Sequence, residues 1–185
     1  MTALRVLLPA LLAMLLLAPA PAQAQVWRDR DVPMRVVANL DIERYLGLGY
    51  EVARFPNRFE RGCVGVTAEY GRLPDGRISV RNICREERLD GPVRSIEGTA
   101  RVEGPGRLSV NFVAWLPFAR GPYWVLHVDP DYGMAVVGAP SGRTGWVLSR
   151  TPAMSNDRWA RARAVLTANG YDIARLEIVP QAPVR

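Results

Sequence analysis

The sequence predicts an all-β domain, an antiparallel barrel or sandwich, followed by one amphipathic α-helix and a short final strand. The first observation is that short β-forming segments follow one another between turns rich in Gly and Pro. The second is that the segments alternate in polarity: Leu108, Val110 and Phe112 share one face, and Ser109 and Asn111 share the other. One apolar face per strand is what an antiparallel sheet closed on itself requires.

The composition is that of a single folded domain. The chain has 185 residues, of which 49 % are hydrophobic and 23 % charged, and this excludes a disordered chain. The net charge is +6, and all 24 basic residues are arginines. One His and two Cys leave too few ligands for a Cys/His zinc site, so we predict no metal and no cofactor.

Residues 1–24 have the features of a secretory signal peptide. Arg5 precedes an apolar run over residues 6–18, and residues 22–24 (Ala-Gln-Ala) form a cleavage site. No cysteine follows the apolar run, so the lipidation site of a bacterial lipoprotein is not expected. We predict cleavage after Ala24 and a periplasmic or secreted protein. Because of export we predict no nucleic-acid partner, and export permits a disulfide.

Eight strands are predicted downstream of a loose N-terminal arm at residues 25–35. Turn signals such as residues 74–76 (Pro-Asp-Gly) and 104–106 (Gly-Pro-Gly) separate the strands. The predicted strands cover residues 49–56, 63–71, 77–84, 93–103, 107–115, 122–128, 134–138 and 145–150.

One helix is predicted after the eighth strand. Ser155 can cap its N-terminus, Asp157 complements the N-terminal dipole, and Gly170 stands in the position typical of glycine after a helix. A stripe at helical spacing predicts one buried face, made of Trp159, Ala162, Val165 and Leu166. A last short strand is predicted at residues 173–179.

Three motifs in a fixed order carry a resemblance to a known family. They are residues 40–60 (LDIERYLGLGYEVARFPNRFE), residues 123–132 (YWVL, then DPDY) and residues 146–152 (WVLSRTP). Over residues 36–181 the chain resembles the lipocalin family, in particular the group of bacterial lipocalins, plant temperature-induced lipocalins and apolipoprotein D. The resemblance implies an eight-stranded antiparallel up-and-down β-barrel with the helix packed outside; residues 182–185 would form a tail.

One position departs from the family. The first motif of the family normally reads Gly-x-Trp-Tyr, but here Gly47 is followed by Leu48, Gly49 and Tyr50. In the family the tryptophan plugs the closed end of the barrel, and an arginine corresponding to Arg150 lies across it. The structural roles of Gly47, Gly49 and Arg150 at the barrel base therefore have two interpretations. Either the cavity is deeper, or the space is refilled, for example by Trp27.

The two cysteines are predicted to form a structural disulfide. If residues 72–75 are a four-residue hairpin loop, Cys63 lies directly opposite Cys84, within cross-strand reach. A one-residue bulge would shift this register. The alternative is a redox pair, but a C-x-x-C motif is absent.

An eight-stranded barrel encloses one pocket for a small ligand. If Gly49 faces inward, alternation also turns Glu51 and Ala53 inward. The resemblance adds further inward residues, namely Ala68, Val80, Asn82, Ile96, Val110, Phe112, Tyr123, Val125 and Trp146. Such a mostly apolar set with few polar groups suits an acyl chain or another elongated hydrophobic molecule. Each of these residues can equally be plain barrel core.

Residues 115–120 (WLPFAR) form an unusually apolar connection between two strands. One interpretation is a rim that contacts a membrane or guides a ligand. The other is a loop tucked against the barrel or a dimer contact. The excess of arginine also has two interpretations. It fits weak attraction to anionic lipid headgroups, and it fits an ordinary solvated surface.

A catalytic site is not evident. His127 lies beside Asp129 in sequence without a G-x-S-x-G nucleophile motif, and inside the barrel only Glu51 and Tyr123 are acid–base candidates. We predict no enzyme but a periplasmic carrier or storage protein, monomeric or homodimeric. It would bind a fatty acid, lysophospholipid or related lipid for envelope maintenance or stress. The alternatives are a binder of tetrapyrroles or carotenoids, an isomerase-type enzyme on the same scaffold, and a protein-interaction scaffold with an empty barrel.

Overall fold

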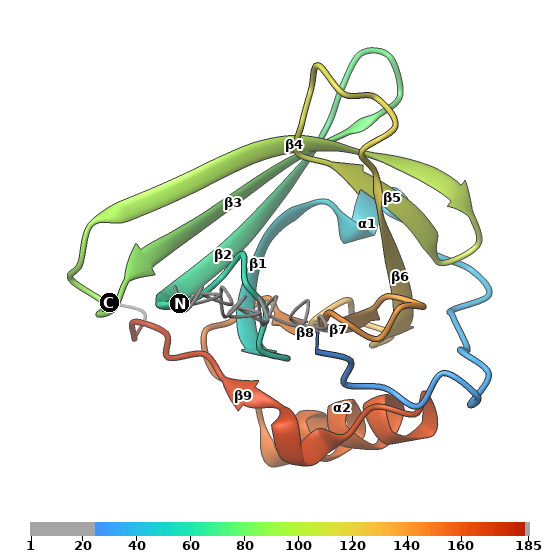
Figure 1. Cartoon of the computed structure of the whole chain (residues 1–185), viewed down its shortest axis with the longest axis vertical. Helices are drawn as coiled ribbons and strands as arrows, with labels where there is room; N and C mark the ends of the chain where they lie inside the picture. Colours follow the sequence, from blue (N-terminus) through green and yellow to red (C-terminus); the bar gives the residue numbers. More distant parts are fainter. Residues whose placement is uncertain (1–24, 184–185) are drawn as a thin grey trace, which may run out of the picture.

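The computed structural model describes residues 25–183, which form a β-barrel with a helix packed against its outside (Figure 1). The predicted signal peptide, residues 1–24, lies outside the described residues. The elements are α1 (Ile42–Tyr45), β1 (Gly47–Arg54), β2 (Cys63–Arg72), β3 (Ile78–Glu86), β4 (Val93–Gly104), β5 (Arg107–Asn111), β6 (Gly121–Val128), β7 (Met134–Gly138), β8 (Gly145–Ser149), α2 (Asn156–Ala168), a 3₁₀ turn η1 (Ile173–Arg175) and β9 (Glu177–Ile178).

Eight antiparallel strands close into a ring in sequence order. β2 to β8 follow one another, and β1 pairs with β8 on one side and with β2 on the other. β9 pairs with the end of β1, at Ala53 and Arg54, and is the extra strand outside the ring. The eight-stranded up-and-down barrel predicted from the sequence is therefore confirmed, as is the C-terminal helix outside it.

Two strands are shorter than predicted, for local reasons. β5 ends at Asn111 because the Asn111 side chain accepts a hydrogen bond from the Val113 amide and donates one to the Leu116 carbonyl, which turns the chain. β9 begins late because Asp172 caps the 3₁₀ turn η1, so only two residues of the predicted strand 173–179 pair with β1.

The N-terminal arm is docked rather than loose. Trp27 and Arg28 are buried, and the Trp27 amide donates to the carbonyl of Gly142. The Arg28 guanidinium donates to the carbonyl of Asn169 at 2.8 Å, behind the C-terminus of α2. These contacts were not predicted because the arm is mostly polar, and its partners are far away in the sequence.

The described residues form two large hydrophobic clusters and a small third one around the disulfide. The outer cluster lies between the barrel and α2, whose Ala162 and Leu166 are fully buried there. Ser155 caps α2 as predicted, and Gly170 follows the helix with a φ of +81°. Burying a side chain such as Leu166 stabilises the docked helix by about 1.5–3 kcal/mol. The inner cluster fills part of the barrel itself.

The disulfide joins Cys63 and Cys84, but the predicted register is wrong. β2 extends to Arg72, which pairs with Ile78, so the turn comprises residues 73–77 instead of 72–75. A β-bulge between Val64 and Thr67 shifts the register back by one residue, so Cys63 lies opposite Glu86. The Cα atoms of the two cysteines are nevertheless 5.4 Å apart, within disulfide range.

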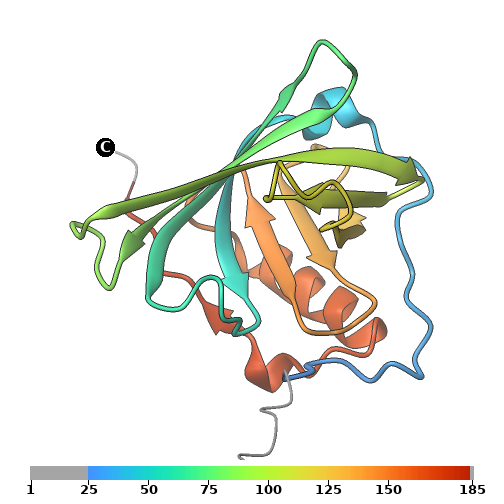
Figure 2. The ribbon, with the colours of Figure 1, turned by 45° about the horizontal axis from the view of Figure 1, so that its top comes forward.

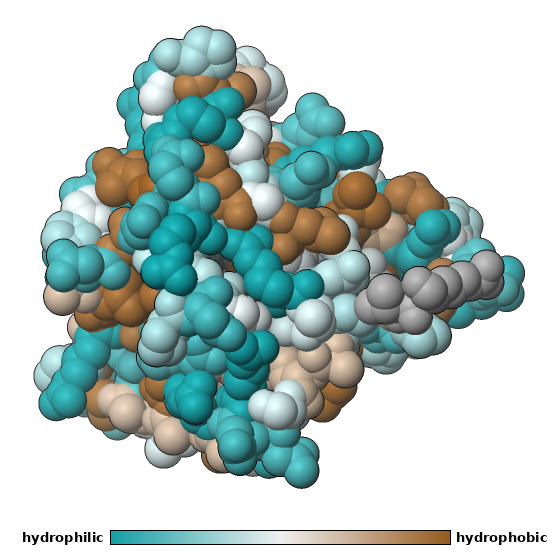
Figure 3. Space-filling model, turned by 180° about the vertical axis from the view of Figure 1, so that it is seen from behind, coloured by the Kyte–Doolittle hydropathy of each residue, from teal (hydrophilic) through white to brown (hydrophobic). Residues whose placement is uncertain are grey.

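Because every strand is antiparallel to the next, the connections alternate between two ends of the barrel (Figure 2). One end, called the mouth here, carries residues 55–62, 87–92, 112–120 and 139–144. The other end, called the base, carries α1 and the remaining connections. Seen from behind, hydrophobic residues form separate patches with hydrophilic residues between them (Figure 3). No helix within residues 25–183 is long and apolar enough to span a membrane.

Candidate ligand-binding site

The structure places nearly all of the predicted pocket residues on the inner face of the barrel. Seven of these residues belong to the inner cluster. Three of them are buried (Ala68, Val80 and Val125), and four are half-buried (Val110, Phe112, Tyr123 and Trp146). Asn82 and Ile96 are paired across β3 and β4, two residues along from the inward-facing Val80. Ile96 is 49 % exposed although it faces inward, so the barrel is open at this level.

Ala53 is the exception, and its predicted inward position is wrong. A β-bulge lies between Glu51 and Ala53, because Glu51 pairs with Leu148 and Ala53 with Val147. The bulge turns Ala53 to the outer cluster beneath α2, where it is fully buried. Simple alternation along β1 fails here, since one extra residue reverses the faces that follow it.

A column of aromatic side chains rises inside the barrel from the base. The Tyr123 hydroxyl lies 2.7 Å from the hydroxyl of Tyr45 and 2.9 Å from that of Tyr70, and the Tyr123 ring stacks on Trp146 with a centroid distance of 6.4 Å. Burial raises the pKa of Tyr70 to about 12 and also raises the pKa values of Tyr45 and Tyr123. The three tyrosines therefore stay neutral and form a hydrogen-bonded cluster inside the barrel.

The base of the barrel is closed without the family's tryptophan. Gly47 and Gly49 lie there with Arg150, whose guanidinium donates to the backbone carbonyls of residues 44, 45, 46 and 48. Tyr45 of α1 is buried at this end, next to a small hollow of about 20 Å³. Trp27 does not refill the site, since it stacks on Phe55 in the outer cluster.

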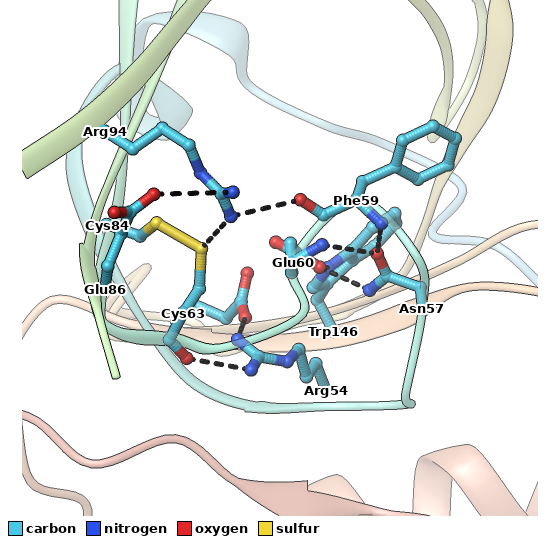
Figure 4. The surroundings of a disulfide bond; sticks show 10 residues. Arg54, Asn57, Phe59, Glu60, Cys63, Cys84, Glu86, Arg94 and Trp146 are labelled. Atoms are coloured by element: carbon cyan, nitrogen blue, oxygen red, sulfur yellow. Dashed lines mark hydrogen bonds and ion pairs between the residues drawn. A yellow bond between two sulfur atoms is a disulfide. The ribbon is translucent and has the colours of Figure 1, made fainter. Parts of the chain in front are cut away.

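A polar network lies at the mouth side of the same interior (Figure 4). The Arg54 guanidinium donates to Glu51 at 3.1 Å and to the Cys63 carbonyl at 2.8 Å. The Trp146 indole donates to the Glu60 carboxylate at 3.0 Å. Burial, together with the nearby charge of Glu60, raises the pKa of Glu51 well above its usual value. Carboxyl, indole and guanidinium groups thus meet where the apolar wall ends.

The mouth is rimmed by exposed apolar side chains from three connections. Trp115 and Phe118 are each 80 % exposed, and Phe59 is 68 % exposed. Leu89 and Arg120 belong to the same rim by sequence. Large exposed aromatic side chains at the entrance of a binding site indicate a surface that meets another apolar surface.

His127 belongs to a different cluster, outside the barrel. Its ring Nε2 lies 3.0 Å from the buried Asp129, which also accepts hydrogen bonds from Arg158 at 3.1 Å and Arg161 at 2.6 Å. Burial raises the pKa of Asp129, but the hydrogen bonds and charges of these partners outweigh it and lower the pKa below its usual value. The cluster joins the β6–β7 connection to α2. Within residues 25–183, no group of three or more His, Cys, Asp or Glu residues could hold a metal ion.

Comparison with known proteins agrees with this geometry. The family model described as a lipocalin-like domain matches residues 40–181. The chain belongs to the lipocalin family. This lipocalin is 39 % identical to temperature-induced lipocalin-1 of Arabidopsis thaliana over 158 residues, which cover 80 % of this chain and 83 % of the relative. It is also 39 % identical over 147 residues to the outer membrane lipoprotein Blc of Escherichia coli K12, covering 79 % of this chain and 82 % of Blc.

Among solved structures, insecticyanin of Manduca sexta superposes on this lipocalin with a TM-score of 0.64. The match covers 81 % of this chain and 85 % of insecticyanin. The sequence identity is 18 %, so this similarity shows the shared fold alone.

Sequence reasoning missed several residues of this interior. Tyr45 was not recognised as the base plug, although Asp41 is a helix N-cap signal four residues before it. Glu60 was missed because it reaches the interior from a connection rather than a strand. Asn57 could have indicated the turn that places Glu60, since the Asn57 side chain accepts hydrogen bonds from the amides of Phe59 and Glu60.

Proposed function

We propose that this lipocalin binds one lipid with an acyl chain, such as a fatty acid or lysophospholipid, inside the barrel. It would act as a carrier or storage protein for envelope lipids, as a monomer or homodimer. The observation that carries the proposal is the inner wall. It is mostly apolar from the tyrosine cluster at Tyr123 up to the accessible Ile96, with the buried side-chain oxygen of Asn82 beside Ile96. The polar groups of Glu51, Arg54 and Glu60 lie at its mouth end. Each CH₂ group moved from water onto this wall contributes about 0.8 kcal/mol.

The protein is proposed to work in an oxidising compartment, the periplasm or the outside of the cell. The buried disulfide between Cys63 and Cys84 supports this, because structural disulfides persist where thiols are not kept reduced. The relative Blc is named an outer membrane lipoprotein, which supports a function at the envelope.

The rim of Trp115, Phe118 and Phe59 is proposed to contact a lipid surface while the ligand enters or leaves. Arg58 and Arg120 stand beside these aromatic residues in sequence, and their charge suits anionic headgroups. Brief contact of this kind would let an acyl chain pass into the barrel with little exposure to water.

The protein is proposed to be a binder and not an enzyme. The interior tyrosine hydroxyls bond to one another, and burial holds their pKa values above the usual range. The Glu51 carboxyl is occupied by Arg54. Neither group is arranged as an acid–base pair for a substrate.

The binding site is tested by a charge placed on the inner wall. Ile96→Glu is expected to weaken binding of a fluorescent palmitate analogue by at least about tenfold, because a carboxylate then faces the acyl chain. Ser95→Glu is the matched control, since it puts the same charge on the outer face of the same strand. Equal affinities of the two variants in a fluorescence titration would show that the ligand is not held inside the barrel.

A further inference from the structure

One polar side chain of the inner wall lacks a hydrogen-bond partner. The side-chain oxygen Oδ1 of Asn82 is buried and accepts no hydrogen bond from the described residues. The residues opposite Asn82 on the two neighbouring strands are Ala68 and Ile96, whose side chains carry no donor. A buried acceptor without a partner lowers stability, so its presence in a binding wall indicates a donor that arrives with the ligand.

A guanidinium group lies next to this oxygen, on the mouth side. Arg94 pairs with Cys84, and the pairing of β3 with β4 is regular from there to Asn82 and Ile96, so Arg94 lies on the same face of the sheet. Diagonal neighbours of this kind have Cα atoms about 7–8 Å apart, close enough for both side chains to contact one ligand. Figure 4 shows the Arg94 side chain beside the disulfide and the Phe59 carbonyl.

The partners of Arg94 within the protein are weak. The guanidinium donates to the Cys63 sulfur at 2.8 Å and to the Phe59 carbonyl at 3.4 Å, and sulfur is a weak acceptor. Its carboxylate partner, Glu86, lies 3.7 Å away, and both side chains are 46 % exposed. An exposed ion pair of this kind contributes little to stability. Arg94 can therefore turn its donors to the carboxylate or phosphate oxygens of a ligand.

The charged groups across the mouth direct an anion to Arg94. Arg54 is bound to Glu51 at 3.1 Å and to the Cys63 carbonyl at 2.8 Å. Glu60 accepts from the Trp146 indole and remains a carboxylate. Of the two arginines in this network, Arg94 has the looser carboxylate partner. An anionic headgroup is therefore attracted to the β3–β4 side of the mouth and repelled from Glu60.

We propose that the lipid held in the barrel carries a hydroxyl group a few bonds from an anionic group. The hydroxyl donates to Oδ1 of Asn82, and Arg94 binds the anionic oxygens. This inference rests on the proposed function and narrows it from acyl-chain lipids in general to hydroxylated ones. Two lipid classes share this chemistry: β-hydroxy fatty acids, and lysophospholipids, whose free glycerol hydroxyl lies near the phosphate. The acyl chain then extends past Val80 toward Tyr123.

The test measures how ligands with one acyl chain displace a fluorescent palmitate analogue. They are dodecanoate, β-hydroxydodecanoate, which adds the hydroxyl, and methyl dodecanoate, which lacks the charge. Asn82→Leu removes the acceptor, and Arg94→Gln removes the cation. Arg81→Gln is the matched control, since Arg81 is exposed and lies on the outer face of β3 beside Asn82.

The wild type and Arg81→Gln are expected to bind β-hydroxydodecanoate about tenfold more tightly than dodecanoate, because one more hydrogen bond is formed. They are also expected to bind dodecanoate about tenfold more tightly than methyl dodecanoate, because the carboxylate binds Arg94. Asn82→Leu loses the first preference and keeps the second, whereas Arg94→Gln keeps the first and loses the second.

Equal binding of β-hydroxydodecanoate and dodecanoate by the wild type overturns the inference and leaves the proposed function intact. A hydroxyl preference that survives in Asn82→Leu, or a charge preference that survives in Arg94→Gln, also overturns it. If the wild type binds none of the ligands, the proposed function and this inference both fail. If Asn82→Leu blocks the barrel for every ligand, Asn82→Ala replaces it.

A lysophosphatidate with the same acyl chain distinguishes the two lipid classes. Tighter binding of the lysophosphatidate than of β-hydroxydodecanoate, abolished in Arg94→Gln, supports a lysophospholipid as the ligand. The reverse order supports a hydroxy fatty acid.

Discussion

At the scale of single residues, Gly49 stands where the first family motif has a tryptophan. Other residues occupy the base of the barrel in place of that side chain. Tyr45 is buried there, and Arg150 binds the carbonyls of the chain that crosses the end. The hollow that remains at the base, about 20 Å³, has room for about one water molecule. We therefore expect the surroundings of Gly49 to compensate for the missing ring, without a deep second cavity at the base.

Restoring the family residue by Gly49→Trp should therefore destabilise the protein, by about 1–3 kcal/mol, because the new ring overpacks a filled site. The free energy of unfolding in urea measures this. Gly121→Trp is the control, since a Cβ at Gly121 meets nothing within 4 Å. A stabilised Gly49→Trp protein would mean that the base is vacant.

The positions of some interior residues could be predicted from the sequence, and those of others could not. Ile96 and Trp146 could be placed inside the barrel from the resemblance, and the strand pairing is regular on both sides of these two residues. Ala53 could not, because the bulge after Glu51 leaves no clear mark in the sequence. Glu60 could not either, because its contact with Trp146 joins positions 86 residues apart.

At the scale of elements, the helix α2 is fixed to the barrel by polar as well as apolar contacts. Ala162 and Leu166 are buried against the sheet, and Arg158 and Arg161 bind the buried Asp129 of the β6–β7 connection. The helix and its cap were predictable, since their signals are local. The ion pairs of Asp129 with Arg158 and Arg161 were not predictable, because they join residues that are distant in the sequence.

Asp129→Asn should lower the free energy of unfolding by about 2–4 kcal/mol, because two arginines lose their buried partner. Since the folded-state pKa of Asp129 is lowered, its contribution is present above the unfolded pKa of about 3.9 and is lost as pH falls through the folded value. Urea unfolding of both proteins between about pH 2 and about pH 7 measures the difference. Asp131→Asn is the control, since the Asp131 side chain is 62 % exposed. Equal losses in the two variants would show that Asp129 is not the anchor.

At the scale of the whole molecule, the barrel could be predicted because the sequence signals of strands and turns are repeated along the chain. Turn residues recur between strands, and each strand carries one apolar face, so an error at Ala53 or in the register at Cys63 does not change the topology. The interior is less predictable than the ring, because two of its polar groups come from outside the strands: Glu60 from a connection and Tyr45 from α1. The fold is that of a lipocalin, and the central claim is that a ligand is held inside the barrel.

Native mass spectrometry of the protein, purified from the periplasm without denaturation, tests this claim most directly. We expect a discrete adduct of one lipid per chain, which organic solvent releases as a fatty acid or lysophospholipid. A coloured adduct would instead identify a pigment as the ligand. A protein that has the mass of the empty chain, and keeps it after incubation with excess lipid, would contradict the claim.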